Sequence, residues 1–293
     1  MAKKLREPAH ELDITDGCEI LVAGGGIAGI AAALAAARNG ARVLLIEREW
    51  MLGGLATLGL VTLYLPLCDG KGRQVVYGIG EELLKLSIKY GAEEGDFPFP
   101  RPWLEGGTFE EKQKVRYRVQ YHPFLFAICA ERLLSDAGVE LLYGPSASAV
   151  LLKDRRIEAV IIENKSGRSA ITVNAVIDAT GDADIYRQSG AKTYQFSQGN
   201  VLASWHYAFS EGKIQLRMAG YADVVKPQSE SKHSPEDESS EDGEKVLSKR
   251  RFTGLDGKEL SEMAEDSHKA LLNIVERERL SHPDYYPVAT PVI

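Results

Sequence analysis

Apolar and polar positions along the first fifty residues predict a strand, a helix and a second strand. Residues 18–23 form a short apolar run that ends at three glycines, which is typical of a strand buried in a parallel sheet. Residues 27–38 are rich in Ala and Leu, and Asn39 and Gly40 supply a helix stop signal. Residues 41–46 predict the next strand, so the segment predicts one βαβ unit.

The pattern is less regular from residue 60 to residue 120, which we interpret as an excursion from the sheet. Within it, residues 80–90 predict an amphipathic helix, and the prolines and aromatics of residues 97–103 predict an extended loop. Residues 124–137 predict a further helix, ended by Gly138. Strands, with a three-stranded β meander among them, are predicted at residues 139–143, 147–152, 157–163, 170–173 and 175–180.

These elements predict an α/β fold: a Rossmann-like domain with a parallel sheet and a β meander, plus a partial mixed α+β second domain. We expect an N-terminal arm at residues 1–17, the main domain at 18–194 and a substrate domain at 195–293. Residues 226–245 are rich in Ser, Glu, Asp and Pro and predict a flexible acidic segment, whereas residues 259–279 are helical in composition.

Composition narrows the functional classes. With 293 residues, 44% hydrophobic and 26% charged, the chain resembles ordinary globular proteins, and its net charge of -7 disfavours a nucleic acid partner. The only cysteines, Cys18, Cys68 and Cys129, are too widely spaced for a disulfide framework or a zinc site, which favours a reducing cytoplasm. We therefore expect no metal. We also expect no membrane partner, because no apolar stretch is long enough to span a bilayer.

A glycine-rich turn separates the first predicted strand from its helix. Gly24 permits the tight turn, Gly26 lets a pyrophosphate approach the main chain, and Gly29 lets the helix pack closely on the strand. The amides of Ile27 and Ala28 at the helix N-terminus would face the phosphate charge. The spacing predicts a dinucleotide-binding site.

An acidic residue completes this unit. Glu47 ends the second strand 18 residues after Gly29, where its carboxylate can accept hydrogen bonds from the ribose hydroxyls of an adenosine and would repel a 2′-phosphate. NADP is therefore disfavoured. An NAD-dependent dehydrogenase remains an alternative, because Glu47 suits NAD and FAD equally.

The unit from Gly24 to Glu47, followed by Gly53-Gly54 and by residues 176–181, resembles the FAD-dependent oxidoreductases of the glutathione-reductase-like superfamily. More narrowly, residues 53–57, 75–81 and 253–259 resemble the bacterial FAD-dependent oxidoreductase family. The resemblance implies an oxidoreductase that holds FAD non-covalently and transfers two electrons between the flavin and an unidentified small-molecule substrate.

The resemblance also implies cofactor-binding positions beyond the glycine turn. They are Arg48 over the adenine, Ala147 at the adenine edge, Gly53, Gly54 and Leu55 along the cofactor, and Thr180, Gly181 and Asp182 in a turn beneath it. A diglycine after the acidic residue favours FAD over NAD, because NAD sites do not need a second close approach of the main chain.

No catalytic acid, base or nucleophile follows from the sequence, and a flavin can react with little more than binding and orientation by the protein. Cys68 is a redox candidate, and His122 and His206 are candidate acids or bases, but a structural role is favoured for each.

Members of the superfamily usually bring a late strand and a glycine-containing turn back to the flavin, and no such segment follows Gly181-Asp182. We therefore expect a C-terminally truncated chain. This leaves open a non-catalytic remnant or subunit that binds a dinucleotide without turnover.

Overall fold

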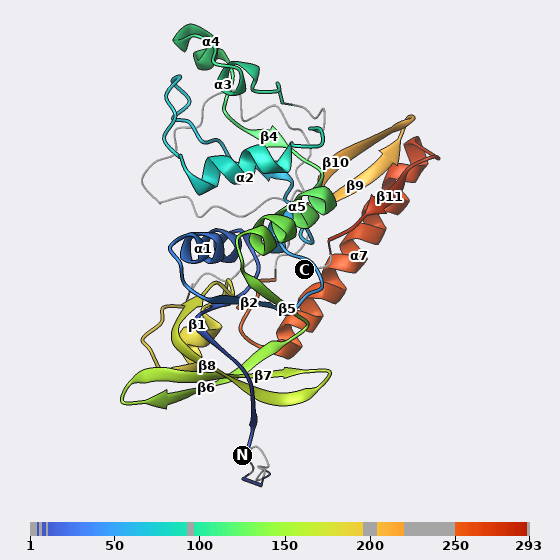
Figure 1. Ribbon diagram of the computed structural model, residues 1–293. Coiled ribbons are helices and arrows are strands. Elements are labelled where there is room, and N and C mark those ends of the chain that lie inside the picture. The colour runs from blue at the N-terminus through green and yellow to red at the C-terminus, as the bar shows by residue number, and fades with distance from the viewer. Residues whose placement is uncertain are drawn as a thin grey trace, which may run out of the picture.

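The centre of the molecule is a six-stranded sheet (Figure 1). The computed structural model describes residues 5, 8–9, 11–92, 97–195, 204–219 and 250–291, and the acidic segment predicted at residues 226–245 lies outside them. In spatial order the strands are β5 (Glu140–Tyr143), β2 (Val43–Glu47), β1 (Asp13–Ala23), β8 (Gly167–Asp178), β7 (Arg156–Asn164) and β6 (Ser146–Lys153). The first four are parallel, and β6, β7 and β8 form an antiparallel meander. The predicted α/β class is confirmed.

Both faces of the sheet are covered. Three helices, α1 (Ile27–Arg38), α2 (Ile79–Ser87) and α5 (Pro123–Asp136), pack on one face and on one another. Leu21 and Leu44 instead belong to a second cluster, which they share with residues of the meander. All five residues of β2 are buried, as expected for a parallel strand covered on both sides.

One predicted pair of strands is a single strand. Residues 170–173 and 175–180 were expected to be separate, but β8 continues from Gly167 to Asp178, paired with β7 on one side and with β1 on the other. The pairing with β7 ends at Thr172, so the next residues pair only with β1. Asn174 is exposed there, which lets a polar residue lie within a continuous strand.

The excursion between β2 and α5 contains more regular structure than predicted. The interpretation of residues 97–103 as an extended loop is wrong at its end, because a short helix, α3 (Arg101–Leu104), begins with Pro102 in its first turn, where proline is tolerated. A second helix, α4 (Phe109–Lys114), begins at a capping box of Thr108 and Glu111. The excursion closes with the two-stranded ribbon of β3 (Leu63–Tyr64) and β4 (Val119–Gln120).

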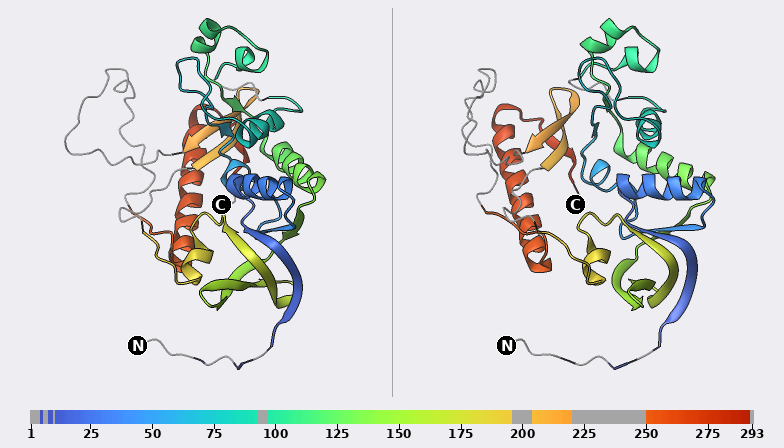
Figure 2. Two further views of the ribbon diagram at one scale, coloured as in Figure 1. Left: turned by 60° about the vertical axis from the view of Figure 1, so that its left-hand side comes forward. Right: turned by 90° about the vertical axis from the view of Figure 1, so that its left-hand side faces the viewer.

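A second, three-stranded antiparallel sheet follows the turn at α6 (Asp184–Gln188). Its strands are β10 (Lys213–Ala219), β9 (Ser204–Ser210) and β11 (Tyr286–Ala289), in that spatial order. The long helix α7 (Gly257–Ser281) extends from the level of the central sheet to the β9–β10 hairpin (Figure 2).

The start of α7 explains a motif that was noted for its family resemblance. Asp256 caps the helix by accepting the N–H groups of Lys258 and Glu259. Glu259 in turn accepts the N–H groups of Thr253 and Gly254. Residues 253–259 therefore form a helix start, and no helix in the described part of the chain, α7 included, is long and apolar enough to cross a membrane.

Candidate functional site

A cavity of about 670 Å³ opens where β1, β2 and β8 end. In open parallel sheets, ligands bind at the carboxyl ends of the strands. The volume lies within the range of about 300–1,000 Å³ that is common for small-molecule and cofactor sites. The fold therefore places a ligand-sized space beside the glycine-rich turn.

Most of the residues predicted from the sequence line this cavity. Those that line it are Gly24, Gly26, Ile27, Ala28, Glu47, Arg48, Gly53, Gly54, Leu55, Ala147, Thr180 and Gly181. Two do not: Gly29 is buried where α1 approaches β1, and Asp182 is exposed at the turn after β8. The predicted residues, far apart in sequence, are thus brought together.

The three glycines of the turn meet different physical demands. Gly24 has a φ of 104°, which is unfavourable for other residues. A Cβ atom on Gly29 would lie 1.8 Å from the carbonyl oxygen of Gly24, so only glycine allows α1 to approach so closely. A Cβ atom on Gly26 would meet no atom within 4 Å, because this residue presents bare main chain to the open cavity.

The diglycine loop is attached to the glycine-rich turn. Gly53 donates its N–H to the carbonyl oxygen of Gly25 at 2.8 Å and forms a parallel bridge with Gly26. Gly53 and Gly54 both have positive φ, at 108° and 53°. A Cβ atom on Gly54 would lie only 3.4 Å from the Cα atom of Gly26. Two stretches of main chain without side chains therefore form one wall of the cavity.

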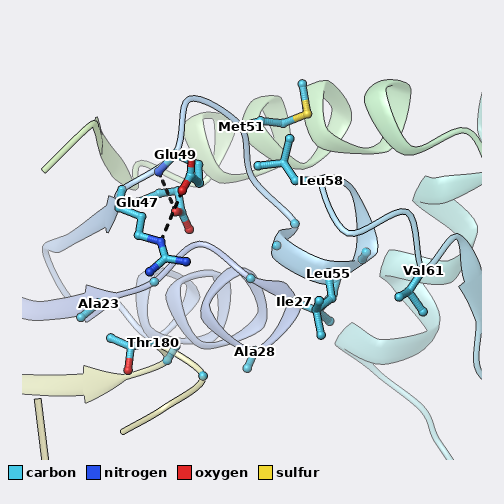
Figure 3. Close-up of a pocket in the computed structure, with 18 of the residues that line it drawn as sticks. Ala23, Ile27, Ala28, Glu47, Glu49, Met51, Leu55, Leu58, Val61 and Thr180 are labelled. Carbon is cyan, nitrogen blue, oxygen red and sulfur yellow. Dashed lines mark hydrogen bonds and ion pairs between the residues drawn. The ribbon is translucent and has the colours of Figure 1, made fainter. Parts of the chain in front are cut away.

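Glu47 lies at one end of the cavity and is buried (Figure 3). Its Oε2 atom accepts the N–H of Gly25 at 2.6 Å, and its Oε1 atom accepts the N–H of Glu49 at 2.9 Å. A carboxylate has about four acceptor positions, so each oxygen can accept one more hydrogen bond. Glu47 thus fixes the glycine turn and still presents acceptors to a ligand.

Arg48 and Ala147 border the same end of the cavity. Arg48 is exposed and forms an ion pair with Glu49 at 3.4 Å. The carbonyl oxygen of Ala147 accepts a hydrogen bond from the Nε2 atom of Gln188 at 3.1 Å, which ties β6 to α6. We call this the adenosine end of the cavity, after the group expected there.

The turn after β8 is organised by Asp178. Its Oδ1 atom accepts the hydroxyl of Thr180 at 2.7 Å, and its Oδ2 atom accepts the N–H of Tyr186 at 3.0 Å. The Thr180 hydroxyl also accepts the N–H of Asp184 at 3.0 Å. Gly181 has a φ of 93° and leaves the main chain bare at the cavity edge. Asp178 was not among the predicted site residues, although it lies within residues 176–181, which carry part of the family resemblance.

The opposite end of the cavity is apolar and was not predicted. We call it the distal end, and the lining side chains there are those of Leu58, Val61, Leu63, Tyr64, Leu65 and Tyr121. Figure 3 shows Glu47 and Glu49 at one side of the cavity and Val61 at the other. The pairing of β3 with β4, and the hydrogen bond from the Tyr121 N–H to the carbonyl oxygen of Thr62, bring Tyr121 beside Leu63 and Tyr64. The clustering of Leu and Tyr at residues 58–65 is the sequence signal that could have found this end.

Two distal tyrosines are held by hydrogen bonds. Tyr64 donates its hydroxyl to the carbonyl oxygen of Gly80 at 2.7 Å, and burial raises the pKa of Tyr64. Tyr121 donates its hydroxyl to the carbonyl oxygen of Ala56 at 2.9 Å. Both rings are therefore fixed walls rather than exposed polar groups.

The three candidate reactive side chains lie outside the cavity lining. The Sγ atom of Cys68 accepts the N–H of Tyr117 at 3.2 Å, and His122 caps α5 by accepting the N–H of Leu125 at 3.3 Å. His206 is buried in β9, where its Nε2 atom and the Tyr285 hydroxyl share a hydrogen bond of 2.8 Å. Each has the structural role that the sequence favoured.

Comparisons with solved structures give similarities of low identity. The chain is similar to the THI4 protein of Thermovibrio ammonificans (20% identity, 60% of this chain and 64% of that one, TM-score 0.42). It is also similar to the L-proline dehydrogenase of P. horikoshii (17%, 66% and 60%, 0.44) and to the p-nitrophenol 4-monooxygenase PnpA of Pseudomonas putida (15%, 67% and 48%, 0.47). The chain thus spans about half to two thirds of the length of these proteins.

A search of curated proteins found no match. In contrast, the sequence profile of a family described as "FAD dependent oxidoreductase" matches residues 19–279. The match covers the glycine-rich turn, the diglycine loop, the turn after β8 and most of α7. The chain therefore belongs to the FAD dependent oxidoreductase family, whose cofactor is FAD.

Proposed function

We propose that this chain binds FAD non-covalently along the cavity and takes part in two-electron oxidation or reduction of a small molecule. The observation that carries the proposal is the bare main chain of Gly26, Gly53 and Gly54 along one wall. The pyrophosphate of FAD needs such a wall, because side chains there would keep its oxygens from the backbone amides.

The adenosine half of FAD fits the adenosine end. The free acceptor positions of Glu47 suit the two ribose hydroxyls, with the adenine between Arg48 and the main chain of Ala147. Family membership favours FAD over NAD at this position. The amides of Ile27 and Ala28, at the N-terminus of α1, would face the pyrophosphate.

The other half of FAD would extend past Leu55 and Gly181 toward the distal end. When bound, the flavin supplies the capacity to accept or donate two electrons. The residues of this chain would bind and orient it, and the apolar distal side chains would exclude water. Non-covalent binding is supported because no cysteine or histidine lies among the described residues that line this cavity.

The experiment compares the purified protein with two glycine variants. The wild-type protein should be yellow and release FAD on heating. Gly26→Ala adds a Cβ atom that meets no protein atom within 4 Å, so the fold should be unchanged while FAD affinity falls about tenfold or more. Gly257→Ala, also free of contacts and outside the cavity, is the matched control.

A colourless wild-type protein that also ignores added FAD would overturn the proposal. Titration with NADH, followed by quenching of Trp50 fluorescence, tests the NAD alternative, because Trp50 is exposed and packs on Gly144 near the adenosine end. Quenching by NADH alone would favour the dehydrogenase.

We also propose the domain division expected from the sequence, with an arm at residues 1–17, an FAD-binding domain at 18–194 and a substrate domain at 195–293. The separate hydrogen bonding of β9, β10 and β11 supports this division. Residues 13–17 of the expected arm belong to β1, so the arm ends before Asp13. A cytoplasmic location is proposed as well, supported by Cys18, Cys68 and Cys129, which are all free thiols.

A further inference from the structure

Residues 54–62, which we call the wall segment, lead from the diglycine loop to the distal end of the cavity. The residues of this segment that line the cavity are Gly54, Leu55, Ala56, Leu58 and Val61. Two main-chain hydrogen bonds close the segment on itself. Val61 donates its N–H to the carbonyl oxygen of Leu55 at 2.9 Å, and Gly59 donates its N–H to that of Gly54 at 3.2 Å.

One residue of the wall segment has an unfavourable main-chain conformation. Leu60 is buried and has a φ of 55°, in the left-handed region that residues with a Cβ atom rarely adopt. Such a conformation persists only where surrounding contacts fix it. The wall segment therefore depends on contacts from outside it to keep Val61, the next residue, at the cavity.

Thr62 makes these contacts at the end of the wall segment. It is fully buried, and its carbonyl oxygen accepts the N–H of Tyr121 at 3.1 Å. Tyr121 in turn donates its hydroxyl to the carbonyl oxygen of Ala56 at 2.9 Å. The hydroxyl of Thr62 shares a buried hydrogen bond of 2.7 Å with the hydroxyl of Tyr207, which lies 145 residues away in β9. The wall segment is thus attached to the second sheet.

The two faces of β9 carry different hydrogen bonds. Successive side chains of a strand project to opposite faces, so Tyr207 and its neighbour His206 point in opposite directions. His206 shares a buried hydrogen bond of 2.8 Å with the hydroxyl of Tyr285. Of these two tyrosine hydroxyls, that of Tyr207 is the one bonded to the wall segment. Tyr285 is therefore a natural comparison for Tyr207.

We propose that Tyr207 is a positioning residue for the flavin: through Thr62 it holds the wall segment against the flavin half of FAD. The inference rests on the proposed FAD site, because it assigns a role to the second sheet at that site. Tyr207 does not line the cavity, so it acts through Thr62 and not by contact with the cofactor. Without this hydrogen bond the main chain could relax at Leu60, and Val61 would move away from the flavin.

Variants that each remove one hydroxyl test this inference. Tyr207→Phe and Thr62→Val change the side-chain volume little and break the same hydrogen bond. Each should release FAD about fivefold faster than the wild type or more, because the wall segment is held less firmly. The visible absorption bands of the bound flavin should shift toward those of free FAD as water reaches the ring. The double variant should be no worse than the stronger single variant, since all three lack the same bond.

Tyr285→Phe is the matched control, because it removes a buried hydroxyl with a hydrogen bond of similar length on the other face of β9. This variant should be less stable than the wild type but equal to it in FAD release and in absorption bands. A merely structural role of Tyr207 would make Tyr207→Phe and Tyr285→Phe alike in both flavin measurements. That result, or additive effects of Tyr207→Phe and Thr62→Val, overturns the inference.

Amide hydrogen exchange of the FAD-free proteins separates the two proposals. The hydrogen-bonded amides of Leu60 and Val61 should exchange about fivefold faster or more in Tyr207→Phe, and at the wild-type rate in Tyr285→Phe. Wild-type protein that binds FAD, with a Tyr207→Phe variant unchanged in FAD release and in exchange, overturns only the positioning role. Wild-type protein without FAD overturns the proposed function, and faster exchange in Tyr207→Phe would then still show that β9 holds the wall segment.

Discussion

The two ends of the cavity are built in different ways. At the adenosine end the wall is main chain, from Gly26, Gly53 and Gly54, together with one buried acid, Glu47. At the distal end the wall is made of apolar and aromatic side chains from residues 58–65 and Tyr121. The first wall depends on side chains being absent, and the second on side chains being present.

This difference separates a general function from a specific one. A wall of main chain suits a pyrophosphate, which is the same in every molecule of FAD. A wall of side chains can vary in shape and polarity, as Leu65 and Tyr64 illustrate, and is suited to selecting a substrate. We therefore expect changes at the adenosine end to remove the cofactor, and changes at the distal end to alter the preferred ligand.

The largest effect is expected from Gly29→Ala, which tests whether the glycines of the adenosine end act through packing. The new Cβ atom would lie 1.8 Å from the carbonyl oxygen of Gly24, so α1 must move away from β1. The free energy of unfolding should fall by about 3 kcal/mol, with FAD binding lost as well. Denaturant titration of the FAD-free protein measures the first effect directly.

Gly26→Ala provides the comparison, because its Cβ atom meets no protein atom within 4 Å. This variant should lose FAD affinity while keeping the stability of the FAD-free protein. Equal stability losses in the two variants would contradict the division between a packing glycine and a cofactor-facing glycine.

A smaller effect is expected from Glu47→Gln. Both carboxylate oxygens accept main-chain N–H groups, and an amide nitrogen would face one of these donors with another donor. An unsatisfied buried N–H costs about 2 kcal/mol, so the FAD-free protein should be destabilised by this amount and should also bind FAD more weakly.

Glu49→Gln is the control for the stability effect of Glu47→Gln, because among the described residues the Glu49 carboxylate forms only a partly exposed ion pair, with Arg48. Exposed pairs contribute about 0.2–1 kcal/mol, so this variant should remain close to wild type. Denaturant titration of both variants measures the free energy of unfolding, and FAD titration measures their affinity for FAD. If the two variants behave alike, Glu47 does not organise the adenosine end.

Local elements were predictable from the sequence where the physical cause is local. The helix predicted at residues 27–38 has the bounds of α1, because composition, the glycine turn and the Asn39-Gly40 stop all act within that segment. The first strand was predicted to begin at residue 18, but β1 begins at Asp13. Its extra residues pair with β8, and a partner so distant in sequence leaves no local signal.

The same reasoning explains which parts of the site were missed. Gly24 and Gly26 were predicted from the glycine-rich turn, where Gly24 adopts a positive φ and Gly26 presents bare main chain, and Gly53 was predicted from the family resemblance. The distal end depends on the pairing of Leu63 with Gln120, two segments separated by an irregular excursion. Ordinary apolar residues there carry no signal until the fold brings them together.

The distal end is also attached to β9 by a hydrogen bond. The buried hydroxyls of Thr62 and Tyr207 share a hydrogen bond of 2.7 Å, which attaches the segment before β3 to the second sheet. Next to Tyr207 lies His206, whose Nδ1 atom is buried and has no hydrogen-bond partner among the described residues. Protonation of His206 would therefore destabilise β9 and its attachment to the distal end, and would leave the adenosine end unchanged.

The smallest expected effect is a pH dependence caused by His206. Burial, and then Arg217, lower the pKa of His206, and Glu278 opposes the shift only in part. Above the ordinary histidine pKa of about 6.5 the folded and unfolded chains are both neutral here. As the pH falls below that value, the unfolded chain binds a proton first, so stability decreases by up to about 1.4 kcal/mol per pH unit until the folded pKa is reached.

Amide hydrogen exchange at pH 7.5 and pH 5.5, corrected for the intrinsic rate, measures where this loss occurs. Amides of β9 should lose protection at the lower pH, while those of β1 and β2 keep it. His206→Gln should remove the difference, because glutamine does not titrate, and His268→Gln, on the exposed side of α7, should not. Equal loss of protection in β2 and β9 would mean that the two ends of the cavity respond to acid as one unit, and the comparison between them would fail at that point.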